Sequence, residues 1–294
     1  MERVSLIVNL GCAIGEGPVY DASADRLCWI DILGGKIHAY RLADGSVASI
    51  AVNQSVGSVA LRESGGFVAA LQNGFCFIDE PDGALREIAA PERDKPNNRM
   101  NDGKCDSKGR FWAGTMSRDL DSGYGAYRPE GALYCLDADL TVTRKAKGVI
   151  LSNGIDWSPD DKTLYYIDTP TRTVAAYAFD AETGAIGSPR IAASVPESMG
   201  MPDGMCVDAE GMLWVALWGG HAVSRWNPAT GELLETIEIP ALNVSSCAFG
   251  CKDYGELFVT TARVGTDVSQ YPGAGGLFSV RPGVSGRPCN LFKG

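Results

Sequence analysis

One sequence unit returns six times along the chain. Each unit has a Gly- or Pro-containing turn, a short strand pattern, a polar turn and a second strand rich in aromatic and β-branched residues, as in "GEGPVYDASADRLCWIDI". Successive units begin 41 to 52 residues apart, near Glu16, Gly57, Asn101, Asn153, Asp203 and Ser246. Periods of about 40 to 50 residues are typical of propeller blades. The repeat therefore predicts an all-β, six-bladed β-propeller, with residues 1–294 as one domain.

Two segments have a predicted place in this propeller. The N-terminal stretch "RVSLIV" is expected to complete the last blade beside "GLFSV", which would close the ring. The longest insertion between units covers residues 116–131. Its Gly, Ser and Tyr content suits a lid over the mouth of the central channel.

Composition excludes several classes of function. The hydrophobic fraction is 45%, but the sequence has no apolar run of the ~20 residues that a membrane helix needs. A formal net charge of -10 repels phosphate backbones and anionic lipids, so we expect neither a nucleic acid nor a membrane partner. The N-terminus lacks the pattern of a signal peptide, which predicts a cytoplasmic protein.

The cysteines and histidines suggest no familiar metal motif. Nine cysteines are scattered along the chain without a CxxC pair, and we expect buried, reduced thiols. The two histidines, His38 and His221, are too few for a His-rich zinc site. His38 falls in the alternating run "GKIHAYRL", where a strand surface position is expected.

Polar residues occur at matching positions of four units. In a propeller the starts of the first strands converge on the axis, and there the units place Glu16, Asn101, Asn153 and Asp203. Carboxylate and amide oxygens favour Ca²⁺, Mg²⁺ or Mn²⁺, although carboxylates also hold Zn²⁺ or Fe²⁺. The alternative is a set of plain turns, because Asn-Gly and Asp-Gly are common turn dipeptides. The joint placement with Glu16 favours a cation site.

Other polar and aromatic residues are expected to be structural. Asp106, Asp156, Asp208 and Glu210 are interpreted as turn acids at the opposite edge or within a blade. The six tryptophans are expected to pack between blades.

Four long motifs carry a family resemblance: "GEGPVYD", "RMNDGKCDSKGRFWAGTM", "LSNGIDWSPDDKTLYYIDT" and "PDGMCVDAEGMLWVALWGG". From Glu16 to about Arg263 the chain resembles the regucalcin/gluconolactonase family, which includes senescence marker protein and luciferin-regenerating-enzyme-like proteins. The resemblance implies a six-bladed propeller that holds one divalent cation in its channel and hydrolyses sugar lactones. By its "GEGP", "SNG" and "PDG" motifs it further implies Glu16, Asn153 and Asp203 as metal ligands.

The same resemblance implies substrate-binding residues. The motif "RMNDG" places the family's substrate contacts on Arg99 and Asn101. Some relatives also use an acid just after "GTM"; here Asp119 is the nearest acid, with Arg118 as the alternative.

These residues suit the hydrolysis of an aldonolactone, of the gluconolactone type or a pentonolactone such as xylono- or arabinono-lactone. A divalent cation would polarise the ester carbonyl, and Asp203 would be metal ligand and general base together. Two alternatives remain open. One is a calcium-binding or interaction propeller without turnover, and the other is a paraoxonase-like aryl or phosphate esterase.

Overall fold

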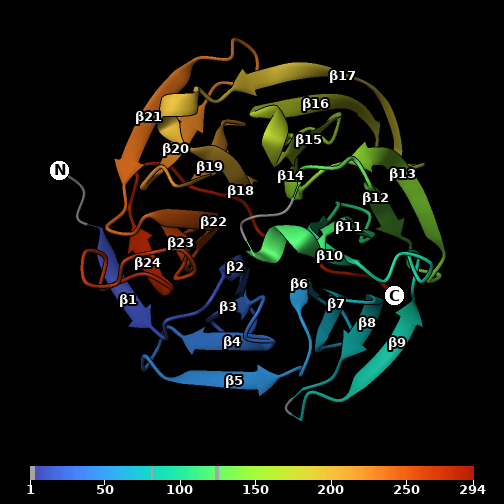
Figure 1. The fold of residues 1–294 in the computed structure, drawn as a ribbon, viewed down its shortest axis with the longest axis horizontal. Helices are drawn as coiled ribbons and strands as arrows, with labels where there is room; N and C mark the ends of the chain where they lie inside the picture. The colour runs from blue at the N-terminus through green and yellow to red at the C-terminus, as the bar shows by residue number, and fades with distance from the viewer. Residues whose placement is uncertain (1–3, 81, 123–125) are drawn as a thin grey trace.

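The six predicted blades are six four-stranded antiparallel sheets arranged in a ring (Figure 1). The structure is a computed structural model that describes residues 4–80, 82–122 and 126–294. In five of the sheets the strands follow chain order from the central channel outwards, because each hairpin places the next strand beside the one before it. The prediction of a six-bladed β-propeller is confirmed.

The first three blades come from the N-terminal half of the chain. Blade 1 contains β2 (Gly15–Asp21), β3 (Arg26–Asp31), β4 (Lys36–Arg41) and β5 (Val47–Ala51). Blade 2 contains β6 (Val56–Leu61), β7 (Phe67–Leu71), β8 (Gly74–Ile78) and β9 (Leu85–Ala89). Blade 3 contains β10 (Asn98–Cys105), β11 (Phe111–Ser117), β12 (Gly131–Leu136) and β13 (Val142–Val149).

The remaining blades follow in order around the ring. Blade 4 contains β14 (Ser152–Trp157), β15 (Thr163–Asp168), β16 (Thr173–Asp180) and β17 (Ala185–Ser194). Blade 5 contains β18 (Met201–Val207), β19 (Leu213–Trp218), β20 (Ala222–Trp226) and β21 (Leu233–Glu238). Blade 6 contains β22 (Asn243–Gly250), β23 (Glu256–Ala262), β24 (Gly276–Val280) and β1 (Ser5–Asn9).

The first strand of the chain closes the ring. β1 pairs antiparallel with β24, with Ser5 opposite Ser279 and Leu6 opposite Phe278. The last blade is thus built from both ends of the chain, as the segment "RVSLIV" predicts. Because this pairing joins residues far apart in sequence, the two ends cannot separate without breaking the last sheet.

The core is divided among the interfaces between neighbouring blades. Trp112 of blade 3 and Trp157 of blade 4 meet edge to face, with ring centroids 5.9 Å apart, as expected for tryptophans that pack between blades. Both faces of the inner strands are buried, whereas the outermost strands β5 and β9 are largely exposed. Burial of apolar surface between sheets therefore stabilises the ring most strongly near the channel.

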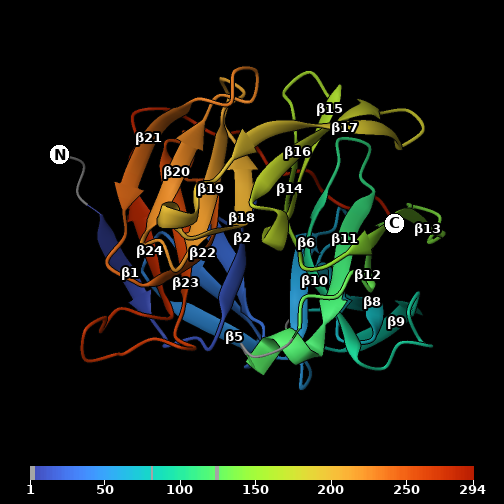
Figure 2. The same ribbon diagram turned by 45° about the horizontal axis from the view of Figure 1, so that its top comes forward.

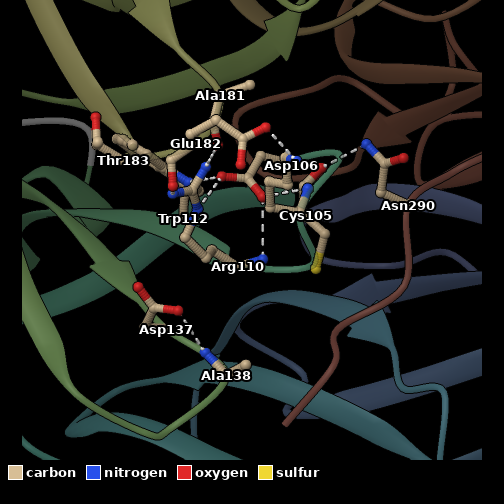
Figure 3. A network of polar contacts seen from close by, with 12 residues as sticks. Cys105, Asp106, Arg110, Trp112, Asp137, Ala138, Ala181, Glu182, Thr183 and Asn290 are labelled. Carbon is tan, nitrogen blue, oxygen red and sulfur yellow. Dashed lines mark hydrogen bonds and ion pairs between the residues drawn. The ribbon is translucent and has the colours of Figure 1, made fainter.

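A buried acid closes the inner hairpin in several blades. Asp106 accepts hydrogen bonds from the Arg110 guanidinium, at 2.6 Å, and from the Trp112 indole, at 2.9 Å (Figure 3). Asp208 holds the Trp214 indole in blade 5 in the same way, at 3.0 Å. These two acids are turn residues, as predicted.

Asp156 belongs to a different set of acids. It lies inside β14 and accepts a hydrogen bond of 2.9 Å from Lys104 of β10, so it is a strand residue paired across two blades. Its position in the unit therefore does not match that of Asp106, because the hairpin position of blade 4 is taken by Ser158, whose hydroxyl accepts from the backbone of Thr163.

The insertion at residues 116–131 begins within a strand. β11 continues to Ser117, and the 3-10 helix η1 (Arg118–Ser122) follows and lies in front of the central channel in Figure 1. Residues 123–125 of the predicted lid lie outside the described residues. Two shorter 3-10 helices are η2 (Thr169–Thr171) and η3 (Glu197–Met199), and within the described ranges no helix is long and apolar enough to cross a membrane.

Candidate metal centre

The innermost strand of every blade contains a β-bulge close to its N-terminal end. In four blades two residues interrupt the pairing with the next strand, and in blades 2 and 6 one residue does. The interrupted stretches lie between Glu16 and Val19, Met100 and Gly103, Ser152 and Ile155, and Pro202 and Met205. A bulge re-aims the side chain beside it. The Asn-Gly and Asp-Gly pairs therefore belong to strand bulges and not to hairpin turns, which rejects the plain-turn alternative.

The glycine after each of two predicted ligands allows neighbouring blades to approach. A Cβ atom on Gly204 would lie 2.2 Å from Oγ of Ser246, and one on Gly154 would lie 2.8 Å from the carbonyl oxygen of Asp203. Neither glycine has a positive φ angle. These two positions are thus glycine because the backbones of adjacent inner strands are close together, not because a turn requires it.

Hydrogen bonds join the predicted amide residues directly. Nδ2 of Asn101 donates to Oδ1 of Asn153 at 3.0 Å and to the carbonyl oxygen of Ser152 at 2.6 Å. Nδ2 of Asn153 donates to Oγ1 of Thr169 at 2.7 Å, and Thr169 donates onward to the carbonyl oxygen of Pro202. Both amide orientations are therefore determined by their partners, which keeps Oδ1 of Asn153 on the side of Asn101.

Three acids of the channel interact unfavourably with one another. Burial, together with the charges of Asp203 and Asp102, raises the pKa of Glu16 well above its ordinary value. Burial and then the charge of Asp102 raise the pKa of Asp203 in the same way, and burial raises the pKa of Asp102 to about 6. Like charges that share a buried site disfavour their ionised forms. A bound cation would remove this penalty.

Asp102 is a channel acid that sequence reasoning overlooked. It follows Asn101 directly in the motif "NDG", and that stretch was interpreted only as a turn or as the position of Asn101. Its charge is partly offset by Lys104, but that ammonium is already paired with Asp156. Asp102, Lys104 and Ser246 border a cavity of about 170 Å³ within the channel.

The predicted ligands offer oxygen atoms of the kind that a divalent cation binds. Glu16, Asn153 and Asp203 are each at least 94% buried and come from three different inner strands. Two carboxylates and an amide oxygen form a ligand set for a hard cation. Thr169 is a residue that sequence reasoning missed, because only the fold brings the start of η2 beside β14. It would act on the cation through Asn153.

Arg99 is buried beside Asn101, and most of its N–H groups already make hydrogen bonds. Its Nε and Nη2 atoms donate to Oδ1 of Asp121 at 3.0 and 2.7 Å, and its Nη1 atom donates to Oδ1 of Asn101 at 2.6 Å. The acid that η1 presents to Arg99 is thus Asp121. The side chains of Arg118 and Asp119 lie on the exposed part of η1, and a substrate contact through either of them stays a prediction.

A larger cavity lies beside Arg99. Its volume is about 570 Å³, and polar residues from blades 2 and 3 border it, among them Gln72, Asn98 and Arg99. Small-molecule sites in proteins have volumes of roughly 300–1,000 Å³. This cavity lies between blades 2 and 3 and reaches the outer strand β9, and its lining residues do not include Glu16, Asn153 or Asp203, so it is separate from the predicted cation site.

Fold and site together define a six-bladed β-propeller with an acidic, oxygen-rich centre in its channel. The sequence matches the family model described as the SMP-30/Gluconolactonase/LRE-like region over residues 14–263. The chain belongs to this family, and the resemblance seen in its motifs is confirmed.

Relatives cover the chain almost from end to end. A regucalcin from Gallus gallus is 41% identical over 96% of this chain and 95% of its own length. The structure of a calcium-binding protein, regucalcin, from Agrobacterium tumefaciens matches with a TM-score of 0.91 and 29% identity, covering 98% of this chain and 96% of that one. A gluconolactonase from Xanthomonas campestris matches with a TM-score of 0.77 and 25% identity, covering 95% and 89%.

Proposed function

We propose that this protein is a divalent-cation-dependent lactonase that hydrolyses sugar lactones of the gluconolactone or pentonolactone type to aldonic acids. The observation that carries the proposal is the crowding of Glu16, Asp102 and Asp203 in one buried channel, where each carboxylate is held near others of like charge. Without a cation such an arrangement costs stability at neutral pH. Membership of a family that includes gluconolactonases supports the choice of reaction.

Glu16, Asn153 and Asp203 would hold the cation. When bound, a divalent cation supplies a Lewis acid that polarises an ester carbonyl and makes water more acidic. Asp203 accepts a proton from the attacking water and returns it to the ring oxygen as the ester C–O bond breaks, so that lactone and water become one hydroxy acid.

Arg99 and Asn101 would bind the sugar. The guanidinium presents N–H groups in a planar arrangement, and Oδ1 of Asn101 can accept a further hydrogen bond although both Nδ2 hydrogens are bound to Ser152 and Asn153, so the pair suits the hydroxyl groups of a polyol. Because Asp121 and Asn101 hold the Arg99 side chain in place, the substrate meets a donor that is already oriented.

Cation binding without turnover is the second candidate. It is favoured by the same three acids and by the similarity to a regucalcin described as a calcium-binding protein. A paraoxonase-like esterase has less support, because His38 lies in the third strand of blade 1 and His221 precedes the third strand of blade 5. The channel acids lie in the innermost strands.

A lactone-opening assay on metal-free protein tests the proposal. Ca²⁺, Mg²⁺, Mn²⁺, Zn²⁺ and Fe²⁺ are added singly, with glucono-, xylono- and arabinono-lactone as substrates and an aryl ester as the comparison. We expect turnover with at least one cation, and a loss of about 100-fold or more in kcat for Asp203→Asn. Asp267→Asn, which changes an exposed loop acid, is the matched control. Tight cation binding with no turnover on any lactone would refute the lactonase and favour the binding protein.

A further inference from the structure

A second group of metal-ligating side chains lies in blade 1, outside the channel. The thiol of Cys12, the carboxylate of Asp31 and the imidazole of His38 each offer a ligand atom, and these atoms lie within 4.8 Å of one another. Cys12 precedes β2, Asp31 ends β3 and His38 lies in β4. All three residues are more than 90% buried. The cluster is therefore a closed site and not an exposed collection of polar groups.

His38 contains a buried nitrogen atom without a partner. Nδ1 lies 2.7 Å from Oγ of Ser49, whereas Nε2 is buried and makes no hydrogen bond. The residue is 4% exposed, which differs from the surface position that the alternating run predicts. A buried polar atom left without a partner costs about 1–3 kcal/mol. The bond from Nδ1 orients the ring as second partners do at metal sites, and Nε2 remains for a ligand.

The carboxylate of Asp31 is oriented by the backbone. Oδ1 accepts hydrogen bonds from the amides of Ile14 and Gly34, and Oδ2 accepts one from the amide of Ala13, each at 3.1 Å. A carboxylate has about four acceptor positions. One position on Oδ2 is therefore left beside Cys12 and His38, in a group that the surrounding loop already fixes.

The thiol of Cys12 does not have the character of a nucleophile. Burial, followed by the charge of Asp31, raises its pKa to about 11. Reactive cysteines are partly exposed and have a lowered pKa. The Cys, His and Asp combination is thus unsuited to covalent catalysis, and although the exposed Lys36 acts on both Cys12 and His38, the three buried side chains themselves include no positive charge. A metal ion supplies that charge and deprotonates a coordinating thiol.

We propose that Cys12, Asp31 and His38 bind a Zn²⁺ ion as three of its four ligands, with a solvent molecule in the fourth position. Sulfur, nitrogen and oxygen ligands in one site suit Zn²⁺, whereas the oxygen-only channel suits a harder cation. Tetrahedral zinc with bonds of about 2.0–2.3 Å separates its ligands by roughly 3.3–3.8 Å, so the three ligand atoms need to move together by about 1.5 Å at most. Binding forms a zinc–sulfur bond and releases the thiol proton to solvent.

This ion would brace the strand that carries Glu16. Asp31 pairs with Gly15 in the sheet, and Glu16 is the next residue along β2. Cys12 lies in the loop that leads into the same strand, and the neighbouring residues Gly11 and Ala13 are only half-buried, so local opening of this loop gives an entry path. The site is chemically distinct from the channel, although it supports one of the channel residues.

Cobalt substitution tests the site by a readout that is independent of lactone turnover. Metal-free full-length protein is titrated with Co²⁺, which binds nitrogen and sulfur ligands in the same series as Zn²⁺. We expect a near-ultraviolet charge-transfer band from a cobalt–thiolate bond, saturating at one equivalent and abolished by added Zn²⁺. The band should remain in Asp203→Asn, where the channel site is impaired.

Variants assign the band to the cluster. Cys12→Ser should abolish it and His38→Gln should weaken cobalt binding at least 10-fold, whereas Cys251→Ser, which changes a half-buried thiol in blade 6, should leave it intact. The absence of a thiolate band from wild-type protein at excess Co²⁺ would overturn the proposal, and so would an unchanged band in Cys12→Ser. If that variant does not fold, the wild-type titration and His38→Gln still decide.

Discussion

Thr169 holds the amide of Asn153 through a hydrogen bond of 2.7 Å, and its own hydroxyl donates to the carbonyl oxygen of Pro202. One hydroxyl thereby connects blade 4 with the strand of blade 5 that contains Asp203. It also determines which way the Asn153 amide faces, since only the nitrogen can donate to Thr169. Thr169, which is not a predicted ligand, thus contacts both Asn153 and the residue before Asp203, the predicted cation ligands of blades 4 and 5.

Replacement of this hydroxyl should weaken cation binding. Thr169→Val keeps the shape of the side chain but removes the bridge, and we expect a loss of about 10-fold in cation affinity, as for other residues that orient a ligand. Isothermal titration with the activating cation measures the effect. Thr171→Val in the same short helix changes an exposed threonine and should leave the affinity within 2-fold. Equal losses in both variants would contradict the role given to Thr169.

Stability of the metal-free protein should decrease as the pH rises. The pKa of Asp102 is raised from 3.8 to about 6, and those of Glu16 and Asp203 are also raised, so the folded state holds protons more tightly than the unfolded chain. The stabilisation from these protons is complete below about pH 4 and is lost as the pH passes through the folded values.

Added cation should reverse this trend, because it binds the ionised carboxylates. We expect the cation-induced increase in Tm to be several degrees larger at pH 7.5 than at pH 5. Scanning calorimetry with and without the cation measures both curves, and Glu16→Gln should reduce the difference between the two pH values. A Tm shift that does not depend on pH would show that the acids do not bind the ion.

Asp121 and Asp119 should differ in their effect on substrate binding. Asp121 accepts from Arg99 at 2.7 Å, so Asp121→Asn releases the guanidinium and should raise KM about 10-fold, the order of one charge-assisted hydrogen bond, with a smaller change in kcat. Asp119→Asn is the matched change on the same helix and tests the acid that the motif "GTM" indicates. Steady-state kinetics decide between them, and a larger rise in KM for Asp119→Asn would favour the motif-based assignment.

Gly204 should tolerate no side chain. A Cβ atom at this position would lie 2.2 Å from Oγ of Ser246 and 2.9 Å from the carbonyl oxygen of Ser245, so Gly204→Ala has to push apart two inner strands. Overpacking of this kind costs about 1–3 kcal/mol, which thermal or urea unfolding measures. Gly187→Ala in the outer strand β17, where the nearest atom is 3.3 Å away, is the control. Equal stability of the two variants would refute the close approach.

The sequence was most informative where a feature repeats. Six returns of one unit were sufficient for the propeller, and the N-terminal strand was correctly placed in the last blade, because each unit buries its apolar face only against a neighbouring unit. The polar residues predicted at the unit starts lie buried in the innermost strands, since the symmetry of the ring brings equivalent positions together, and their roles as ligands stay predictions. Glu16, Asn153 and Asp203 are of this kind.

Residues that act through contacts between different elements of a blade could not be identified from the repeat. The partners Thr169 and Asn153 are 16 residues apart, and Asp121 reaches Arg99 across 22 residues of sequence through an insertion that no other unit shares. Asp156 was interpreted as a turn acid, but it stands three residues after Asn153, whereas Asp106 stands five residues after Asn101. The paired strands show that both units contain the same two-residue bulge, so Asp156 corresponds to Lys104 and Ser158 takes the hairpin position.

The sequence by itself determined the blade number, the place of the N-terminal strand in the last blade and the presence of Glu16 and Asp203 at the starts of inner strands, because the periodic pattern of buried residues is a local property of each unit. The tertiary structure alone decided that Asp102 shares the channel with Glu16 and Asp203, that Asp121 holds Arg99, and that Cys12, Asp31 and His38 meet inside blade 1. The physical reason is that charge repulsion, hydrogen bonding and metal ligation depend on distances between side chains, and these distances exist only once the ring has closed.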